Sequence, residues 1–371
     1  MHHGNLQEYR ARLKDELAPL FQSLRDRIPD EPEGFRPATL AYLDRGGKLL
    51  RPALVCLAAG ACGGDEAAQR ALPIAAAVEI LHAMTLVHDD IIDDDPERHG
   101  GPSVHAIFGQ QAKARANSKL HPPPPLYGKS MAILAGDVLH AAAVWMALEH
   151  APRRGVPPQV VNAIVTRMEG DLFPALIAGQ ALDTWLGTIP LQDLVRWEIQ
   201  KISRMARRIN ELKTARLLSF AAYAGALIGL RKTDGRHSWV RRLAAFGSQC
   251  GLAFQIRDDV LGIVGDSRRL GKPVGSDIRE GKKTLLLSCV LAVVSGQERR
   301  HLVARYGAAD CDQQTAEELR SIIIRSGCVE KLSHQAARIL SRAKTELRIF
   351  PASSYRRLLS EWADYVAARR Y

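Results

Sequence analysis

Aromatic residues and cysteines are scarce in this chain of 371 residues. Phenylalanine, tryptophan and tyrosine make up only 6% of it, and there are six cysteines. The cysteines do not show the short spacings of a structural zinc site, and several lie in apolar helical stretches, so we expect reduced core thiols. Alternating runs of β-branched residues are also rare, which argues against a protein built from sheets.

Long hydrophobic runs and a secretory signal are missing as well. The first seventeen residues, MHHGNLQEYRARLKDEL, are polar. The longest apolar stretches, such as residues 217–230 and 285–294, are shorter than the roughly 20 residues that cross a bilayer. We therefore expect a cytoplasmic protein without a transmembrane segment.

The residues that are abundant point to helices. Hydrophobic residues make up 46% of the chain, and apolar positions recur at steps of three and four, as around Val78, Leu81 and Thr85. No linker separates two periodic halves, so we predict one all-α domain over residues 1–371. The net charge is +11, but the densest basic stretch, residues 201–216, has no interleaved aromatic residues. We therefore expect no nucleic-acid partner.

One segment has low complexity. It covers residues 109–130 and reads GQQAKARANSKLHPPPPLYGKS. Four consecutive prolines cannot continue a helix. We predict a loop insertion here, either a plain surface loop or a lid that orders when substrate binds.

The strongest functional signal is the run LVHDDIIDDDPERHG at residues 86–100. Asp89 and Asp93 are four residues apart, so on a helix they share one face, with Asp90 beside them. Crowded carboxylates repel one another unless a cation neutralises them, and such oxygen ligands suit Mg²⁺ that is shared with a substrate phosphate. A solvated acidic helix end is the alternative, which the apolar, alanine-rich segment before the acids disfavours.

A second acidic motif, AFQIRDDVLGIVGD, covers residues 253–266. Asp258 and Asp259 are adjacent, and Gln255 precedes them by about one helical turn. The following segment, GKPVGSDIREGKKT, supplies four more charged residues: Lys272, Asp277, Lys282 and Lys283. A carboxylate pair followed by spaced lysines matches a metal-bound polyphosphate, whose oxygens would be shared between metal and ammonium groups.

A third motif, RGGKLLRP at residues 45–52, is cationic. Lys48 and Arg51 are three apart, and we expect them to project together from the first turns of a helix that begins near Gly47. Pro52 fits only in the first helical turn, or if the helix starts later. Glycines allow the backbone to approach an anion closely. A surface loop is the alternative.

These three motifs, in this order, resemble those of the all-trans isoprenyl diphosphate synthases, which include the farnesyl and geranylgeranyl diphosphate synthases. The match runs from about residue 40 to residue 287, and ILAGD, GQALD and LKTA at residues 133–137, 179–183 and 212–215 also fall in family order. The resemblance implies a helical bundle around a central cavity and a homodimer. It also implies condensation of isopentenyl diphosphate with an allylic diphosphate (dimethylallyl, geranyl or farnesyl), with three Mg²⁺ ions per active site.

The resemblance also implies roles for individual residues. The metal ligands it implies are Asp89, Asp90, Asp93, Asp258 and Asp259. The substrate-binding residues are Lys48, Arg51, His82, Arg98, His99, Gln180, Lys213, Thr214, Gln255, Lys272 and Lys282. The catalytic residues are Asp89, Asp93, Arg98, Lys213, Thr214, Asp258 and Lys272, and the cations among them would neutralise the departing pyrophosphate.

Two positions depart from the family pattern. His99 stands where a second arginine is usual, which predicts a weaker or pH-dependent contact with isopentenyl diphosphate. Gly262 stands where the second motif usually has a third acid, and Asp266 lies one turn too far along to replace it.

Product length would be set on the helix that carries the first motif, because in the family the growing tail follows that helix. Thr85, Met84 and Leu81 lie one and two turns before Asp89, and Leu81 is about 12 Å from it. None is a bulky aromatic residue, so we predict a product beyond fifteen carbons, with geranylgeranyl diphosphate preferred. The alternatives are a farnesyl or longer product, a class I terpene cyclase, which would not need the second acidic motif, and a non-catalytic partner subunit, which would usually have lost acids from the first.

Overall fold

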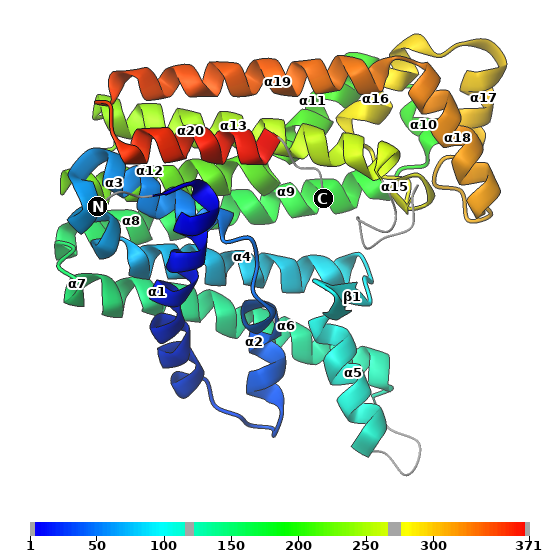
Figure 1. The fold of residues 1–371 in the computed structure, drawn as a ribbon. Helices are drawn as coiled ribbons and strands as arrows, with labels where there is room; N and C mark the ends of the chain where they lie inside the picture. Colours follow the sequence, from blue (N-terminus) through cyan, green and yellow to red (C-terminus); the bar gives the residue numbers. More distant parts are fainter. Residues whose placement is uncertain (1–3, 116–121, 266–275, 368–371) are drawn as a thin grey trace. The chain divides into compact units, whose positions relative to one another are not determined.

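The computed structural model describes residues 4–115, 122–265 and 276–367. Within these ranges every regular element is helical except one hairpin of two short strands (Figure 1). The prediction of an all-α chain is therefore confirmed.

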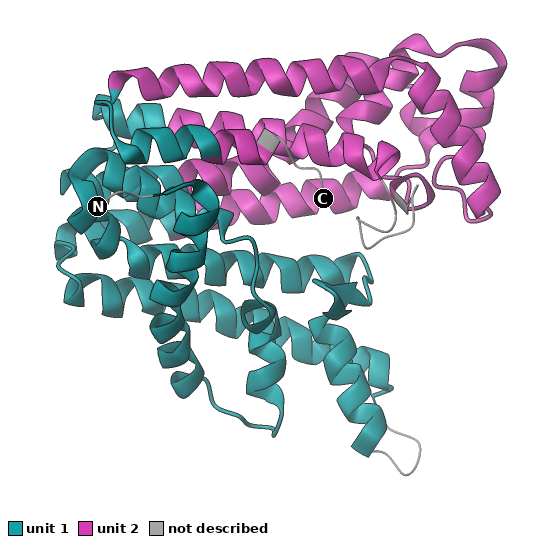
Figure 2. Ribbon diagram, viewed as in Figure 1, with its two compact units in different colours: residues 1–168, 221–243, 350–361 teal, residues 169–220, 244–349, 362–371 magenta. Residues whose placement is uncertain are grey.

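The chain divides into two compact units (Figure 2). Unit 1 consists of Met1–Met168, Ala221–Leu243 and Phe350–Glu361, and unit 2 consists of Glu169–Phe220, Ala244–Ile349 and Trp362–Tyr371. Each unit is assembled from three separate stretches, so no single linker divides the chain into halves. The expectation of one domain stays a prediction.

Unit 1 contains most of the N-terminal helices and the hairpin. Its elements are α1 (Leu6–Arg27), α2 (Phe35–Arg45), α3 (Leu50–Arg70, interrupted at Gly64), α4 (Leu72–Ile92), β1 (Glu97–Arg98), β2 (Gly101–Pro102), α5 (Val104–Arg115), α6 (Pro124–Trp145), the π-helical turn η1 (Met146–His150), α7 (Ala151–Arg153) and α8 (Pro158–Arg167). Helix α4 is buried on nearly all sides from Leu72 to Met84 and packs against α3 and α6. It is therefore the core helix of unit 1.

Residues 4–6 are joined to residues 357–361 within unit 1. Helix α1 begins at a capping residue, because the Asn5 side chain accepts a hydrogen bond from the backbone N–H of Glu8 at 3.0 Å. The backbone N–H of Leu6 donates to Glu361 Oε2 at 3.0 Å, and Arg357 Nη2 donates to the carbonyl of Gly4 at 2.8 Å. The first and last helices of unit 1 are thus joined by hydrogen bonds.

The chain passes from unit 1 to unit 2 within the π-helical turn η2 (Met168–Leu172). The elements that lie wholly in unit 2 are α9 (Phe173–Gly187), α10 (Leu191–Leu194), α11 (Ile199–Asn210), the π-helical turn η3 (Glu211–Ala215), α15 (Ser276–Arg279), α16 (Leu285–Val293), α17 (Gly296–Arg305), α18 (Gln313–Arg325), α19 (Cys328–Glu346) and the 3₁₀ turn η4 (Leu347–Ile349). Three helices contribute residues to both units: α12 (Arg216–Leu230), α13 (Ser238–Val264) and α20 (Ser354–Ala367).

The predicted loop at residues 109–130 is wrong over most of its length. Helix α5 continues to Arg115, and α6 begins at Pro124. Proline is tolerated in the first helical turn, where its missing N–H has no partner inside the helix, so Pro124 and Pro125 open α6 rather than break it. Residues 116–121 lie outside the described ranges.

Two helical segments, Leu72–Ile92 and Pro124–Arg153, are long and apolar enough to cross a membrane by length and composition alone. The sequence analysis did not single them out, because it considered uninterrupted apolar runs. Within the protein, 67% and 50% of these segments' most apolar windows are buried. A core helix that is apolar on all sides passes the same test.

Candidate active site

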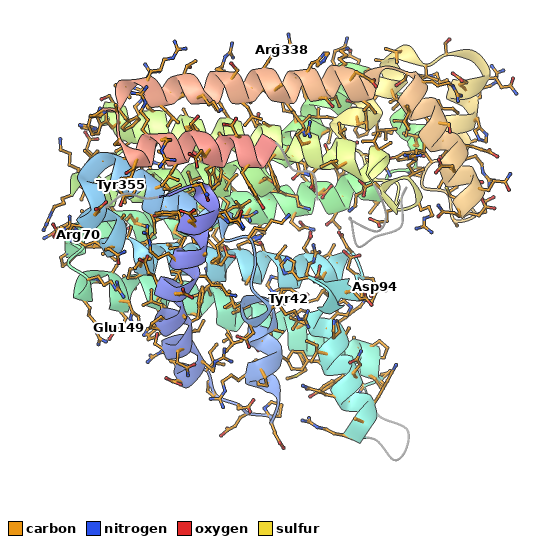
Figure 3. The ribbon with its side chains drawn as sticks, viewed as in Figure 1. Tyr42, Arg70, Asp94, Glu149, Arg338 and Tyr355 are labelled. Atoms are coloured by element: carbon orange, nitrogen blue, oxygen red, sulfur yellow. The ribbon has the colours of Figure 1, made fainter. Side chains whose placement is uncertain are left out.

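The first acidic motif lies at the C-terminal end of α4. Asp93 ends the helix, its backbone N–H donating to the carbonyl of Asp89 at 2.8 Å, so the two residues share one face as predicted. Asp89 is partly exposed, and Asp93 is exposed. The adjacent Asp94 is exposed as well (Figure 3). Carboxylates are unfavourable at this end of a helix, where the helix dipole is negative. The arrangement therefore favours a bound cation.

The short hairpin brings Arg98 back to these acids. His99 and Gly100 form its two-residue turn with φ of 53° and 72°, as a tight hairpin of this length requires. Arg98 Nε donates to Asp90 Oδ1 at 2.8 Å, and Arg98 Nη2 lies 3.8 Å from Asp89 Oδ2. Arg98 Nη2 also lies 3.5 Å from Asp95 Oδ2, so one guanidinium serves three carboxylates of the motif.

Asp90 faces the interior and not the metal side. Arg98 Nη2 and the hydroxyl of Tyr42 both donate to its carboxylate, and the same hydroxyl accepts from the backbone N–H of Val104 at 3.2 Å. Tyr42 reaches Asp90 from α2 (Figure 3). Burial raises the pKa of Asp90, although the hydrogen bonds from Arg98 and Tyr42 oppose the shift. The metal-ligand role predicted for Asp90 stays a prediction; in this structure its two oxygens accept hydrogen bonds from Arg98 and Tyr42.

The residues present fit Mg²⁺ that is bound jointly by protein and substrate. Within the described ranges, no three acidic, histidine or cysteine side chains converge as a complete metal site. Mg²⁺ does not need one, because it keeps several waters and is usually held by one or two carboxylates plus substrate phosphates. Asp89 and Asp93 supply such a pair.

The cationic motif lies between α2 and α3. Helix α3 begins at Leu50, so the expectation of a helix starting near Gly47 was wrong: Lys48 lies in the preceding loop, while Arg51 lies in the first turn. The cause is Leu49, whose left-handed backbone (φ 47°) cannot belong to a helix. Pro52 then falls within the first turn, where it is tolerated.

Two histidines join this cationic motif. Burial holds the pKa of His82 well below its usual range, and the charges of Arg51, His99 and Arg98 lower it further. Burial also lowers the pKa of His99, as do Arg98 and Lys48, among others. Arg51 and Arg98 thus lie within electrostatic range of His82, and Arg98 and Lys48 within range of His99. These shifts favour the neutral imidazoles, so the lysine and the two arginines supply the positive charge of the motif.

The residues predicted to set product length lie one and two turns before Asp89, as expected. Leu81 and Met84 are 0% and 1% exposed. Thr85 is partly exposed, and its hydroxyl donates to the carbonyl of His82 at 2.7 Å. The first two residues are therefore core residues of unit 1 in this structure.

In unit 2, the candidate residues begin with an ion pair between α9 and η3. Lys213 Nζ donates to Asp183 Oδ2 at 2.6 Å, and Gln180 lies one turn before Asp183. Gly179 makes this contact possible, because a Cβ there would lie 2.7 Å from Leu212 Cβ and 2.9 Å from the backbone nitrogen of Lys213. The glycine of GQALD thus lets the two segments approach.

Thr214 and Gln255 belong to a hydrogen-bonded chain that ends at Asp259. Thr214 Oγ1 donates to Gln255 Oε1 at 2.8 Å, Gln255 Nε2 donates to Asp259 Oδ1 at 3.1 Å, and Asn210 Nδ2 reaches Asp259 Oδ2 at 3.5 Å. Burial raises the pKa of Asp259 to about 8. The metal-ligand role predicted for Asp259 likewise stays a prediction; in this structure its carboxyl is buried and accepts hydrogen bonds from Gln255 and Asn210. Asp258 beside it is partly exposed.

Asp277 takes the space next to Gly262. A Cβ on Gly262 would lie 2.2 Å from Asp277 Oδ2, and Lys282 Nζ lies 3.8 Å from Asp277 Oδ1. A third carboxylate therefore joins Asp258 and Asp259 from a different helix, α15, at the place where the family pattern has an acid on α13. Lys272 lies outside the described residues.

Tyr42 and Asp277 are site residues that the motifs did not predict. Tyr42 lies in a helix that precedes the cationic motif and has no motif signal of its own. Asp277 was noted in GSDIREGKK but was not counted as a site residue. The sequence does contain one indication of its role. The second motif lacks its usual third acid at Gly262, so an acid from another segment could be expected to take that place.

Comparison with known proteins gives a consistent result. The family model for polyprenyl synthetase matches residues 33–323. The chain is similar to a short chain isoprenyl diphosphate synthase of Methanothermobacter thermautotrophicus, with 34% identity over 351 residues that cover 94% of this chain and 95% of that protein. It is also similar to a geranylfarnesyl diphosphate synthase of Aeropyrum pernix, with 33% identity over 91% of this chain and 95% of that protein.

A solved structure agrees with these relatives. It is a geranylgeranyl pyrophosphate synthase from Corynebacterium glutamicum complexed with isoprenyl diphosphate and magnesium, with a TM-score of 0.81 and 26% identity, covering 99% of this chain and 100% of that one. The resemblance drawn from the motifs is thereby confirmed. Because the family model and both relatives cover most of its length, the chain belongs to the polyprenyl synthetase family and is an isoprenyl diphosphate synthase, a transferase.

Proposed function

We propose that this enzyme joins isopentenyl diphosphate to an allylic diphosphate in the presence of Mg²⁺ and makes chiefly geranylgeranyl diphosphate. The observation that carries the proposal is the pairing, in unit 1, of solvent-facing carboxylates with a separate cluster of cations. An enzyme that handles two diphosphates needs both a metal-dependent and a metal-free anion site. Asp89 and Asp93 suit the first, and Lys48 and Arg51 suit the second.

For the allylic substrate, we assign Asp89, Asp93 and Asp258 as the residues that would hold Mg²⁺, three ions in all. When bound, the metal would neutralise the negative charge that develops on the leaving pyrophosphate. Lys213 adds a cation to the same task, and Lys272 joins it by its place in the motif. Asp90 and Asp259 act indirectly: Asp90 orients Arg98, and Asp259 anchors the Gln255–Thr214 chain.

Isopentenyl diphosphate would be held by Lys48, Arg51 and Arg98, with His82 and His99 as neutral hydrogen-bonding partners. The allylic C–O bond breaks, and its electron pair leaves with pyrophosphate. The double bond of isopentenyl diphosphate then attacks the allylic carbon, and a proton passes from the new chain to the departing pyrophosphate. Positioning replaces a bimolecular encounter, so no protein base is required.

The length of the product is proposed from α4. Leu81, Met84 and Thr85 lie on the helix along which the tail would grow, and none of them is aromatic. The relatives span products of different lengths: the Corynebacterium enzyme is named for a geranylgeranyl product and the Aeropyrum enzyme for a geranylfarnesyl product. A twenty-carbon product is consistent with non-aromatic side chains at these positions.

We also propose a homodimer and a cytoplasmic location. Helix α6 exposes Leu126, Ile133 and Leu134 at 56%, 48% and 53%. Several large apolar side chains exposed on one helix suggest a surface that a second copy covers. Light scattering should give twice the chain mass, and Ile133→Glu should reduce it to the mass of one chain; a monomeric parent would contradict this proposal.

The test of the reaction is direct. Purified enzyme is incubated with isopentenyl diphosphate, Mg²⁺ and each allylic diphosphate in turn, and the products are identified by mass. A twenty-carbon diphosphate is expected, and chelation of Mg²⁺ should abolish it. A hydrocarbon formed from an allylic diphosphate alone would indicate a cyclase, and no product at all would indicate a non-catalytic subunit.

A further inference from the structure

A partly buried acid, Glu79, lies near Arg51 in unit 1 and has no part in the reaction described above. It lies on α4, three residues before His82, so the two side chains share one face of the helix. A Cβ on Gly47 would lie 3.3 Å from Glu79 Oε1. The carboxylate therefore lies against the loop between α2 and α3, the loop that carries Lys48.

The position is costly for a carboxylate. Burial raises the pKa of Glu79, and Arg51 is the charge that opposes the shift. A desolvated carboxylate is retained in a protein only when it is paired or serves a purpose. In a pocket that must bind a diphosphate, a negative charge works against the ligand. Glu79 therefore acts either as a counter-charge to Arg51 or as a support for the groups that bind the diphosphate.

The backbone of the loop favours the second role. Gly46 and Leu49 have φ of 71° and 47°. A left-handed leucine is strained and persists only where its surroundings hold it. Arg10 Nε holds the loop from α1 by donating to the carbonyl of Lys48 at 2.5 Å. The Glu79 carboxylate lies against the same loop from α4, at Gly47.

We propose that Glu79 is a positioning residue for isopentenyl diphosphate. Its carboxylate fixes the loop at Gly47 and the guanidinium of Arg51, so that Lys48 and Arg51 meet the diphosphate together. The inference rests on the proposed function, which assigns this cluster to isopentenyl diphosphate.

The test uses Glu79→Gln, which keeps the shape and removes the charge. If Glu79 positions the cluster, KM for isopentenyl diphosphate rises about ten-fold, the loss typical of one charge-assisted contact. KM for the allylic substrate and kcat at saturation stay within two-fold, which a general loss of structure would not allow. Glu79→Asp, whose carboxylate is one methylene shorter and cannot reach the loop, should also raise KM.

A counter-charge predicts the opposite sign. Removing it makes the pocket more positive, so Glu79→Gln would lower KM for isopentenyl diphosphate, and Glu79→Asp would leave it unchanged. Either result, or an unchanged KM in Glu79→Gln, overturns the inference. Melting temperatures of all variants confirm that they are folded.

Two further variants complete the design. Glu66→Gln is the matched control, because Glu66 is an exposed glutamate of α3 whose partner is Arg70, and it should leave every constant unchanged. Arg51→Ala separates the two claims: if it raises KM for isopentenyl diphosphate and Glu79→Gln does not, only the present inference fails. If neither variant affects that KM, the assignment of the cluster to isopentenyl diphosphate fails.

Discussion

The carboxylate of Asp277 stands where a side chain at position 262 would begin, since a Cβ on Gly262 would lie 2.2 Å from Asp277 Oδ2. The two residues are fifteen positions apart and belong to different helices. An acid at 262 and the present placement of Asp277 are therefore mutually exclusive.

This exclusion predicts the effect of restoring the acid of the family pattern. Gly262→Asp should lower kcat/KM by about ten-fold or more, roughly 1.4 kcal/mol, because the new carboxylate displaces Asp277 and repels it. Gly262→Ala should cost less, since the end of the Asp277 side chain can move. Gly262→Asp combined with Asp277→Ala should recover activity relative to Gly262→Asp alone; additive losses in the double variant would show that the two positions are independent.

Removing a carboxylate that faces solvent should abolish most of the turnover. Asp89→Ala, Asp93→Ala and Asp258→Ala should each lose on the order of a thousandfold in kcat, because each would remove a ligand of the ion that neutralises pyrophosphate. Raising the Mg²⁺ concentration should restore part of the loss. Near-normal kcat in any one variant would remove that residue from the metal site.

The cationic cluster should act on one substrate only. Lys48→Ala and Arg51→Ala should each raise KM for isopentenyl diphosphate by about ten- to a hundredfold, as expected for a charge-assisted phosphate contact of about 1.5–3 kcal/mol. Steady-state kinetics with the allylic substrate varied in turn serve as the control. Equal damage to both KM values would mean that the two diphosphate sites have been exchanged.

His99 should behave as a neutral residue over most of the working pH range. Burial, and then Arg98, lower its pKa, so the imidazolium forms only below the pH at which a free histidine would protonate. His99→Arg adds a permanent charge and should lower KM for isopentenyl diphosphate clearly at pH 8 and less at pH 6. The same KM in parent and variant at both pH values would show that residue 99 does not face this substrate.

Substitutions on α4 should change the product. Met84→Phe should shorten the main product by at least one isoprene unit, because the ring blocks the path of the tail. Leu81→Ala should lengthen it, at a cost of about 2–5 kcal/mol in the free energy of unfolding, because Leu81 is fully buried. Product mass and helicity are measured together. If both folded variants make the product of the parent, another helix limits the tail.

Local patterns predicted the α4 site well and the long-range contacts poorly. Asp89 and Asp93 share a face because they are four apart on a helix, which spacing alone indicates. Helical spacing also indicates a different direction for Asp90. Adjacent residues on a helix point about 100° apart, and Asp90, next to Asp89, points into the core. Lys48 was wrongly predicted to lie in a helix, because no local sequence pattern predicts the left-handed backbone of Leu49 that delays the helix start. The pairing of Gly262 with Asp277 depends on how α15 returns to α13, which no spacing encodes.

The hydrogen bonds that join residues 4–6 to residues 357–361 have a consequence for synthesis. Glu361 accepts a hydrogen bond from the backbone of Leu6, and the Tyr355 hydroxyl donates to Asp65 Oδ1 at 2.8 Å. Unit 1 therefore cannot complete its packing until the ribosome has added the 355 positions that separate Leu6 from Glu361. Until then, α1 and α3 lack these hydrogen bonds, and an incompletely packed unit of this kind is prone to aggregate during synthesis.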